Sequence, residues 1–128
     1  MYKILIIDDT HGIRKMLSRH LRRFDYETLE AESGRDALKA LREKEVDLIL
    51  LDQMMPEMDG LETFENIKKE ILFSIPVIMI TAHGSLNLAV TFMKAGGVDF
   101  IEKPIDIDVL VIKIRQALKQ KKRQKKKV

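Results

Sequence analysis

Five polar residues with complementary chemistry each stand at or soon after the end of a short, largely apolar segment. Asp8 and Asp9 follow residues 4–7, Asp52 follows residues 48–51, Thr81 follows residues 76–80, and Lys103 comes soon after residues 98–101. If these runs are parallel strands, their carboxyl ends meet at one edge of a sheet, where ligands bind in open α/β folds. The sequence therefore predicts three carboxylates, one hydroxyl and one ammonium at a single site.

This set of groups fits phosphoryl transfer to a carboxylate. Three carboxylates at close range repel one another and raise their pKa values unless a cation joins them, and Mg²⁺ takes oxygen ligands of this kind. A carboxylate can itself be a nucleophile that forms an aspartyl phosphate. Metal, ammonium and hydroxyl groups are suited to surround the negative oxygens of a phosphoryl group in transfer.

Each of these residues also has an ordinary structural interpretation. The acidic pair at 8–9 could end a strand at a turn, Asp52 could cap a helix, Thr81 could be a strand-end β-branched residue, and Lys103 could be a surface charge. Their occurrence together at successive strand ends favours a functional site over four separate structural roles.

The rest of the chain supplies the elements that would position the site. Continuous apolar runs at residues 4–7, 48–51 and 76–80 are typical of strands buried on both faces of a parallel sheet, and residues 26–31 and 98–101 are shorter strand candidates. Helical spacing follows each strand, as in Ile13, Met16, Leu17, His20, Leu21 and Phe24.

Helix boundaries are marked by polar residues and by glycine. Ser33, Asp59, Ser85 and Asp106 are predicted to begin the later helices, and Gly96-Gly97 is predicted to end the fourth. Five strand–helix units predict an α/β protein, a (βα)5 flavodoxin-like three-layer fold. The parallel five-stranded order would be 2-1-3-4-5, although periodicity alone also allows a six-stranded Rossmann half.

Composition limits the alternatives further. The 128 residues suit one domain, and the absence of cysteine excludes disulfides, cysteine-ligated zinc and a cysteine nucleophile. No apolar run reaches the ~18 residues of a membrane span, and the first run is too short for a signal peptide. We expect a cytoplasmic protein without membrane contact.

Charge is distributed unevenly along the chain. Seven of the 23 Lys and Arg residues lie after Leu118, where no acidic residue occurs, so the net charge of +3 comes from the tail. We expect a domain over 1–118 and a basic tail or the beginning of a linker over 119–128. Such a tail could also bind nucleic acid or anionic lipid.

The site residues and their spacing resemble those of bacterial two-component response-regulator receiver domains, close to the chemotaxis-regulator type. The resemblance covers the chain up to about Leu118. Its motifs are Asp8-Asp9, the segment 52–60 (DQMMPEMDG), Thr81-Ala82 and Lys103-Pro104.

The resemblance implies a role for each position. Asp52 would accept the phosphoryl group from a sensor histidine kinase or a phosphotransfer protein. Asp9 would bind Mg²⁺ directly and Asp8 mainly through water, with Asp52 and the backbone carbonyl of Met54 as further ligands. Thr81 would donate a hydrogen bond to the phosphoryl group, and Lys103 would pair with another of its oxygens.

The resemblance also implies a switch. Ala82 would leave room for the phosphate, the peptide before Pro104 would be cis, and the ring of Phe100 would turn inward as Thr81 moves toward the phosphate. The output surface would be the fourth helix, last strand and last helix. Phe100 stands where many members have tyrosine, Gly96-Gly97 replaces the usual Gly-Ala and would loosen the turn, and His83 is interpreted as a bystander.

Three other functions use some of the same features. A flavin binder would need a glycine- or hydroxyl-rich phosphate loop after the first strand, where this chain is acidic. An aspartate-based phosphohydrolase would need a second acid near Asp52, which is followed by Gln53 and Met54. A degenerate receiver that only binds proteins would lack one of the site residues.

The resemblance implies partners as well. Besides the kinase, a homodimer that forms on phosphorylation is a candidate partner. The chain could be a stand-alone switch or the receiver of a larger regulator or hybrid kinase, and an effector domain of such a regulator could bind DNA. The chain would be a phosphoacceptor signalling domain and not an enzyme in the usual sense.

Overall fold

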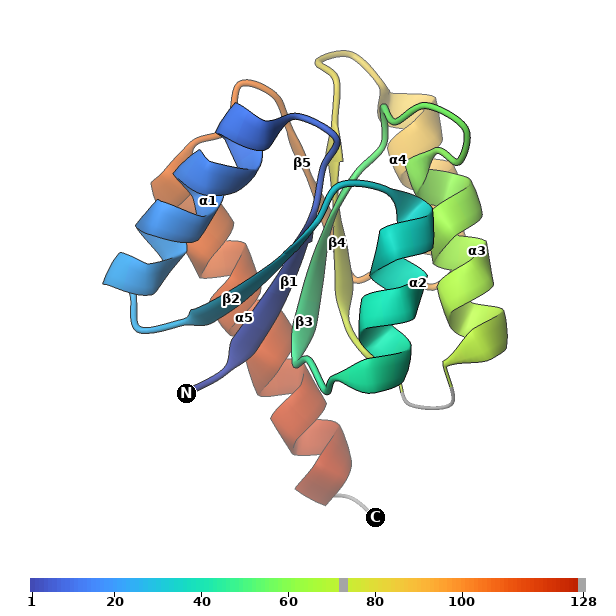
Figure 1. The fold of residues 1–128 in the computed structure, drawn as a ribbon. Coiled ribbons are helices and arrows are strands. Elements are labelled where there is room, and N and C mark those ends of the chain that lie inside the picture. Colours follow the sequence, from blue (N-terminus) through green and yellow to red (C-terminus); the bar gives the residue numbers. More distant parts are fainter. Residues whose placement is uncertain (72–73, 127–128) are drawn as a thin grey trace.

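A parallel sheet of five strands lies between two layers of helices in the computed structural model (Figure 1), which describes residues 1–71 and 74–126. The elements alternate strictly: β1 (Lys3–Ile7), α1 (His11–Arg23), β2 (Glu27–Ala31), α2 (Gly34–Glu43), β3 (Leu48–Asp52), α3 (Gly60–Glu70), β4 (Val77–Thr81), α4 (Leu86–Lys94), β5 (Asp99–Glu102) and α5 (Ile107–Lys126).

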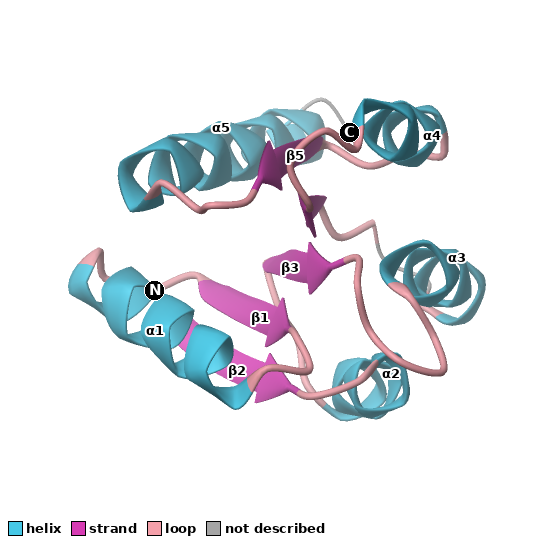
Figure 2. Ribbon diagram, turned by 90° about the horizontal axis from the view of Figure 1, so that it is seen from above, coloured by secondary structure: helices cyan, strands magenta, loops and turns pink. Residues whose placement is uncertain are grey.

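The strand order confirms the flavodoxin-like prediction. The sheet runs β2-β1-β3-β4-β5 with every neighbouring pair parallel. Helices α1 and α5 cover one face, and α2, α3 and α4 cover the other (Figure 2). The order reverses between β1 and β3, which is where such folds bind ligands at the carboxyl ends of their strands.

The central strands are buried on both faces, which explains their continuous apolar runs. Ile4 and Ile6 of β1 pack in the core beneath α1 and α5, whereas Leu5 and Ile7 pack in the core beneath α2, α3 and α4. Side chains alternate between the two faces along a strand, so a strand covered twice has no polar position. The first polar residue after such a strand is therefore placed at the edge of the sheet.

The predicted helix starts are largely confirmed. Ser33 accepts a hydrogen bond from the Asp36 backbone N–H at 3.1 Å, Asp59 from Glu62 at 2.9 Å, and Asp106 from Val109 at 3.3 Å. Such caps satisfy N–H groups that lack partners within the helix. Ser85 precedes α4 without a capping hydrogen bond from its side chain, so this helix begins with weaker local support.

Helix α4 buries only some of its apolar residues. Ala89 is buried, and the other buried residue is Phe92, whereas Leu86, Val90 and Met93 are exposed. The two glycines after α4 have different structural reasons. Gly96 has a φ of +114°, and a Cβ at Gly97 would overlap the Phe92 ring. The second glycine makes room for a large aromatic side chain.

Helix α5 continues past residue 118 and ends at Lys126. The boundary predicted at 118 therefore falls within a helix. Among the described residues, no helix is long and apolar enough to cross a lipid bilayer.

Candidate functional site

All five predicted polar residues lie at the carboxyl ends of neighbouring strands. Asp8 and Asp9 follow β1, Asp52 is the last residue of β3, Thr81 is the last of β4, and Lys103 directly follows β5. These four strands are consecutive in the sheet, so residues from four distant parts of the sequence meet at one edge. Their convergence, predicted from the apolar runs, is confirmed.

The acidic residues form a tight cluster. Asp8, Asp9 and Asp52 each offer a carboxylate oxygen, and these oxygens all lie within 4.8 Å of one another. Asp8 is 1% exposed and Asp52 is 2% exposed, whereas Asp9 is open to solvent. Two buried carboxylates and one exposed carboxylate therefore share one small volume.

Lys103 is the cation closest to the nucleophile candidate. Its Nζ lies 3.1 Å from Oδ1 of Asp52. The contact is an ion pair without the direction of a hydrogen bond, and Oδ1 has no hydrogen-bond partner among the described residues. Asp8 Oδ2 and Thr81 Oγ1 are buried and equally without a partner there.

These unpaired atoms indicate that the site is built for a ligand. Buried polar atoms are nearly always hydrogen-bonded, because leaving one unsatisfied costs about 1–3 kcal/mol. Here Asp8 Oδ2 and Thr81 Oγ1 have no hydrogen-bond partner among the described residues, and Asp52 Oδ1 has only its ion pair with Lys103. The donor set of three carboxylates consists of hard oxygen atoms, which fits Mg²⁺ better than a soft metal.

The electrostatics of the site follow from burial. The pKa of Asp52 is raised to about 6, first because the carboxyl is removed from water and second because the Asp8 carboxylate is close, while Lys103 opposes the rise. Burial also raises the pKa of Asp8, and the hydrogen bond from the Thr10 N–H at 2.8 Å opposes that rise. Both pKa shifts arise mainly from burial, and the neighbouring carboxylates add to them.

Gln53, which the motif contained but our sequence analysis gave no role, organises the loop after Asp52. Its N–H donates to Ile80, its carbonyl accepts from Met55 and Gly60, and its side-chain Oε1 accepts from the Leu61 N–H at 2.9 Å. It therefore ties β3 to the first turn of α3, with the exposed Met54 between them.

Gly60 is required by this close approach. A Cβ at that position would lie 2.7 Å from Oε1 of Gln53 and 2.8 Å from the Asp52 carbonyl oxygen. The role of Gln53 had a signal in the sequence, because a polar residue directly follows a strand that is fully buried. The loop that carries the Met54 carbonyl is thus fixed at both ends.

The loop after β4 is attached to β5 through Glu102. The Glu102 carboxylate accepts a hydrogen bond from the Gly84 N–H at 2.9 Å and lies 3.3 Å from Nδ1 of His83. His83 is 88% exposed and makes this contact at the rim. Glu102 was not among the residues predicted from the sequence. It directly precedes Lys103, so the residue that holds the loop after β4 is the chain neighbour of the lysine in the site.

The remaining predicted residues also lie around this edge. Ala82 is exposed beside Thr81, and the peptide bond between Lys103 and Pro104 is cis, as the resemblance implies. Phe100 is half-buried, and the Lys113 ammonium lies 5.9 Å from the centre of its ring.

The raised pKa of Asp52 predicts how the free energy of unfolding depends on pH. A carboxyl whose pKa is higher in the folded state than in the unfolded state stabilises the fold at low pH, and this stability is lost as the pH rises through about 6. In the presence of a metal chelator at pH 7.5, Asp52→Asn should raise the free energy of unfolding by roughly 1–3 kcal/mol.

The advantage of this variant should shrink as the pH is lowered from 7.5 to 4, in urea unfolding followed by circular dichroism. Asp25→Asn replaces an exposed carboxylate and serves as the control, with no change beyond about 0.5 kcal/mol. A destabilised Asp52→Asn protein at pH 7.5 would contradict the charge analysis.

Comparison with known proteins agrees with this geometry. The family model described as "Response regulator receiver domain" matches residues 4–115. The chain is 40% identical over 117 residues to the transcriptional regulatory protein GlrR of Escherichia coli (strain K12), a match that covers 91% of this chain and 26% of that protein. It is 41% identical over 115 residues to the transcriptional regulatory protein ZraR of Klebsiella oxytoca, covering 90% and 26%. The chain thus spans about a quarter of these relatives.

Solved structures give the same result. A response regulator receiver domain protein from Clostridium thermocellum superposes with a TM-score of 0.89 at 33% identity, covering 95% of this chain and 98% of that one. FixJ-N superposes with a TM-score of 0.85 at 34% identity, covering 93% and 94%. NtrX from Brucella abortus superposes with a TM-score of 0.92 at 33% identity, covering 98% and 29%. The chain belongs to the response regulator receiver domain family of two-component systems.

Proposed function

We propose that this chain accepts a phosphoryl group on Asp52 from a sensor histidine kinase or a phosphotransfer protein, in a reaction that depends on Mg²⁺. The observation that carries the proposal is the pairing of a buried carboxylate with an ammonium 3.1 Å away, beside two further carboxylates. A group with several negative oxygens is the ligand that this mixture of charges accommodates.

Asp52 is the nucleophile. One carboxylate oxygen attacks the phosphorus of phosphohistidine, so that an O–P bond forms while the N–P bond breaks and its electron pair returns to the imidazole. Asp52 is the best placed of the three acids, because it ends a central strand, is buried, and contacts Lys103. Burial keeps its carboxylate poorly hydrated and therefore ready to attack.

The acidic residues would also hold the metal. Asp8, Asp9, Asp52 and the backbone carbonyl of Met54 are the proposed ligands, with Asp8 acting mainly through water. When bound, Mg²⁺ neutralises the negative charge gathered on the carboxylates and on the phosphoryl oxygens. The Asp8 carboxylate is already fixed by the Thr10 N–H, which leaves its second oxygen free for this purpose.

Thr81 and Lys103 would bind the oxygens of the transferred group. Lys103 pairs with one oxygen by a short movement of its flexible side chain away from Asp52. Thr81 donates a hydrogen bond from its hydroxyl to another oxygen, and this hydroxyl has no competing partner among the described residues. Exposed Ala82 leaves room for the phosphate because its side chain is a single methyl group.

These movements would operate a switch. Thr81 and Phe100 are the switch residues, and phosphorylation draws Thr81 toward the new charge. Glu102 strengthens the coupling in this chain, because it holds the loop after Thr81 and precedes Lys103. The ring of Phe100, half-buried in the structure, turns inward as the loop moves.

The chain would thus be a signalling domain that promotes its own phosphorylation and slowly loses the phosphate. Its proposed location is the cytoplasm. The alternative is a degenerate receiver that only binds proteins. Buried atoms of Asp8, Asp52 and Thr81 without hydrogen-bond partners favour a receiver that is phosphorylated over one that only binds proteins. A pure binding module gains nothing from keeping these atoms buried.

Incubation with acetyl phosphate tests the proposed reaction. Intact-mass spectrometry should detect one added phosphoryl group in the presence of Mg²⁺ and none with a chelator. Asp52→Asn should gain none, and Lys103→Met should gain it at least about tenfold more slowly, because the transition-state charge loses a partner.

Glu57→Gln is the control. It removes an exposed charge from the loop between β3 and α3 and should react like the wild type. A wild-type protein that stays unmodified would refute the proposal in favour of the binding module.

The output surface would be α4, β5 and α5. The two helices flank edge strand β5 (Figure 2), and they expose apolar side chains: Leu86, Val90 and Met93 on α4, and Val109 and Ile112 on α5. A second copy of the chain is the proposed partner of this surface on phosphorylation.

The relatives are named transcriptional regulatory proteins. A DNA-binding effector region, reached through the basic segment 119–128 after domain 1–118, is the proposed target of the signal.

A phosphate mimic tests this surface. Beryllium fluoride with Mg²⁺ should shift the amide resonances of residues 82–100 and double the mass measured by light scattering. Val90→Glu should keep the spectral change and lose the dimer, because the added charge opposes burial of α4. Unchanged resonances in residues 82–100 would refute the switch, and a monomer with changed resonances would refute the dimer.

A further inference from the structure

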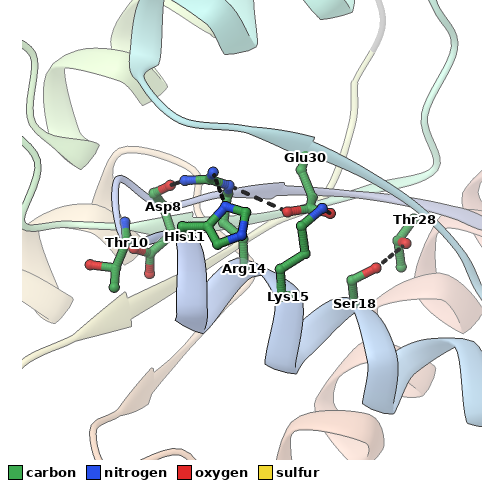
Figure 3. Close-up of polar contacts among 8 residues, drawn as sticks. All are labelled: Asp8, Thr10, His11, Arg14, Lys15, Ser18, Thr28 and Glu30. Carbon is green, nitrogen blue, oxygen red and sulfur yellow. Dashed lines mark hydrogen bonds and ion pairs between the residues drawn. The ribbon is translucent and has the colours of Figure 1, made fainter.

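Arg14, a residue that the functional assignment does not use, contacts the backbone of the acidic site. It lies on α1 and is 9% exposed, which is unusual for a charged side chain. Its Nη1 donates a hydrogen bond to the main-chain carbonyl oxygen of Asp8 at 2.8 Å (Figure 3). That carbonyl belongs to the peptide group that joins Asp8 to Asp9.

The other two nitrogens of the guanidinium also have neighbours. Nε lies 3.3 Å from Oε1 of Glu30 on β2, and Nη2 lies 3.4 Å from Nδ1 of His11 (Figure 3). Glu30 is itself largely buried, and its second oxygen pairs with Lys15 at 3.0 Å. A planar guanidinium held on three sides has one orientation, so the carbonyl that it binds is held firmly.

Arg14 completes the attachment of the corner between β1 and α1. The Asp8 N–H donates to the Ala31 carbonyl at 3.1 Å, and the Thr10 N–H donates to the Asp8 carboxylate at 2.8 Å. With Arg14 on the carbonyl, both main-chain groups of Asp8 and one of its carboxylate oxygens are fixed. The remaining oxygen, Oδ2, is buried and has no partner among the described residues.

The Arg14 guanidinium orients the main chain at Asp8 and does not neutralise the Asp8 carboxylate. It binds Asp8 through the main-chain oxygen and leaves Asp8 Oδ2 unpaired, whereas its nearest carboxylate partner is Glu30. A buried, paired cation is expensive to maintain, and here its extra hydrogen bond goes to the peptide between two proposed metal ligands. Groups that orient metal ligands typically change metal affinity by 10–100-fold when removed.

We propose that Arg14 is a positioning residue that sets the Mg²⁺ affinity of the site by fixing the Asp8–Asp9 peptide, with Glu30 holding its guanidinium in place. The proposal rests on the proposed function, because it assigns a role toward Mg²⁺ and phosphoryl transfer. Arg14 touches neither the metal nor the phosphoryl group in this role.

The test compares Arg14→Gln with Lys15→Gln, which removes the other, 52% exposed partner of Glu30 and leaves the Asp8 contact intact. Calorimetric titration of MgCl₂ should give a dissociation constant about tenfold higher for Arg14→Gln and within about twofold of wild type for Lys15→Gln. The Mg²⁺ concentration that half-saturates the acetyl phosphate reaction should rise in parallel, while the rate at saturating Mg²⁺ changes less.

Two further readouts separate positioning from a general loss of structure. The metal-free Arg14→Gln protein should show shifted amide resonances at residues 8–10 and a cooperative thermal transition. Arg14→Lys should recover part of the affinity, because an ammonium can reach the carbonyl but cannot bind three partners in one plane. A folded Arg14→Gln protein with wild-type Mg²⁺ affinity overturns the proposal.

Glu30→Gln covers the case in which Arg14→Gln does not fold. It keeps Arg14 and weakens the ion pair that orients it, so the dissociation constant for Mg²⁺ should rise several-fold, and an unchanged value overturns the proposal. Wild-type protein that neither binds Mg²⁺ nor gains a phosphoryl group overturns the proposed function itself. Wild-type protein that does both while every Arg14 variant matches it overturns only this inference.

Discussion

Mutual repulsion among three carboxylates is the constraint on which the rest of this structure depends. Asp8, Asp9 and Asp52 bring oxygen atoms within 4.8 Å of one another, and two of these side chains are almost fully buried. Burial and proximity raise the pKa of Asp52 to about 6, so the folded chain stores unfavourable charge at neutral pH. A bound cation relieves this repulsion, whereas a phosphoryl group on Asp52 would add negative charge to the same cluster. A site with this much unbalanced charge responds strongly to either change.

The fold offsets the cost through rigid supports on every side of the cluster. Buried central strands deliver the acids to one edge, since their apolar side chains on both faces hold the strands in register. Arg14 fixes the peptide after Asp8, and Gln53 fixes the loop after Asp52. Lys103 supplies the one ammonium that contacts Asp52 among the described residues. Glu102, next to that lysine, connects the loop that would move to the strand that would report the movement.

The sequence predicted the fold and the convergence of the site because both depend on the ends of continuous apolar runs. It did not predict the supports, because these are polar contacts between distant elements that leave no periodic signal. Arg14 is instructive: Ile13 and Met16 were placed on the buried stripe of α1, yet both are only half-buried, while Arg14, Leu17, Ser18 and Leu21 are buried. A basic residue three and seven positions before buried leucines was the available signal. On α4 the apolar residues do not mark the buried face, because Leu86, Val90 and Met93 are exposed.

The most direct test of the central claim is to locate the phosphoryl group chemically. Borohydride reduces an aspartyl phosphate to homoserine, so reduction of the acetyl phosphate-treated protein followed by peptide mass mapping identifies the acceptor. The account predicts homoserine at position 52 alone, because only Asp52 among the three acids is both buried and paired with Lys103. Homoserine at position 8 or 9, or at none of the three positions, would contradict it.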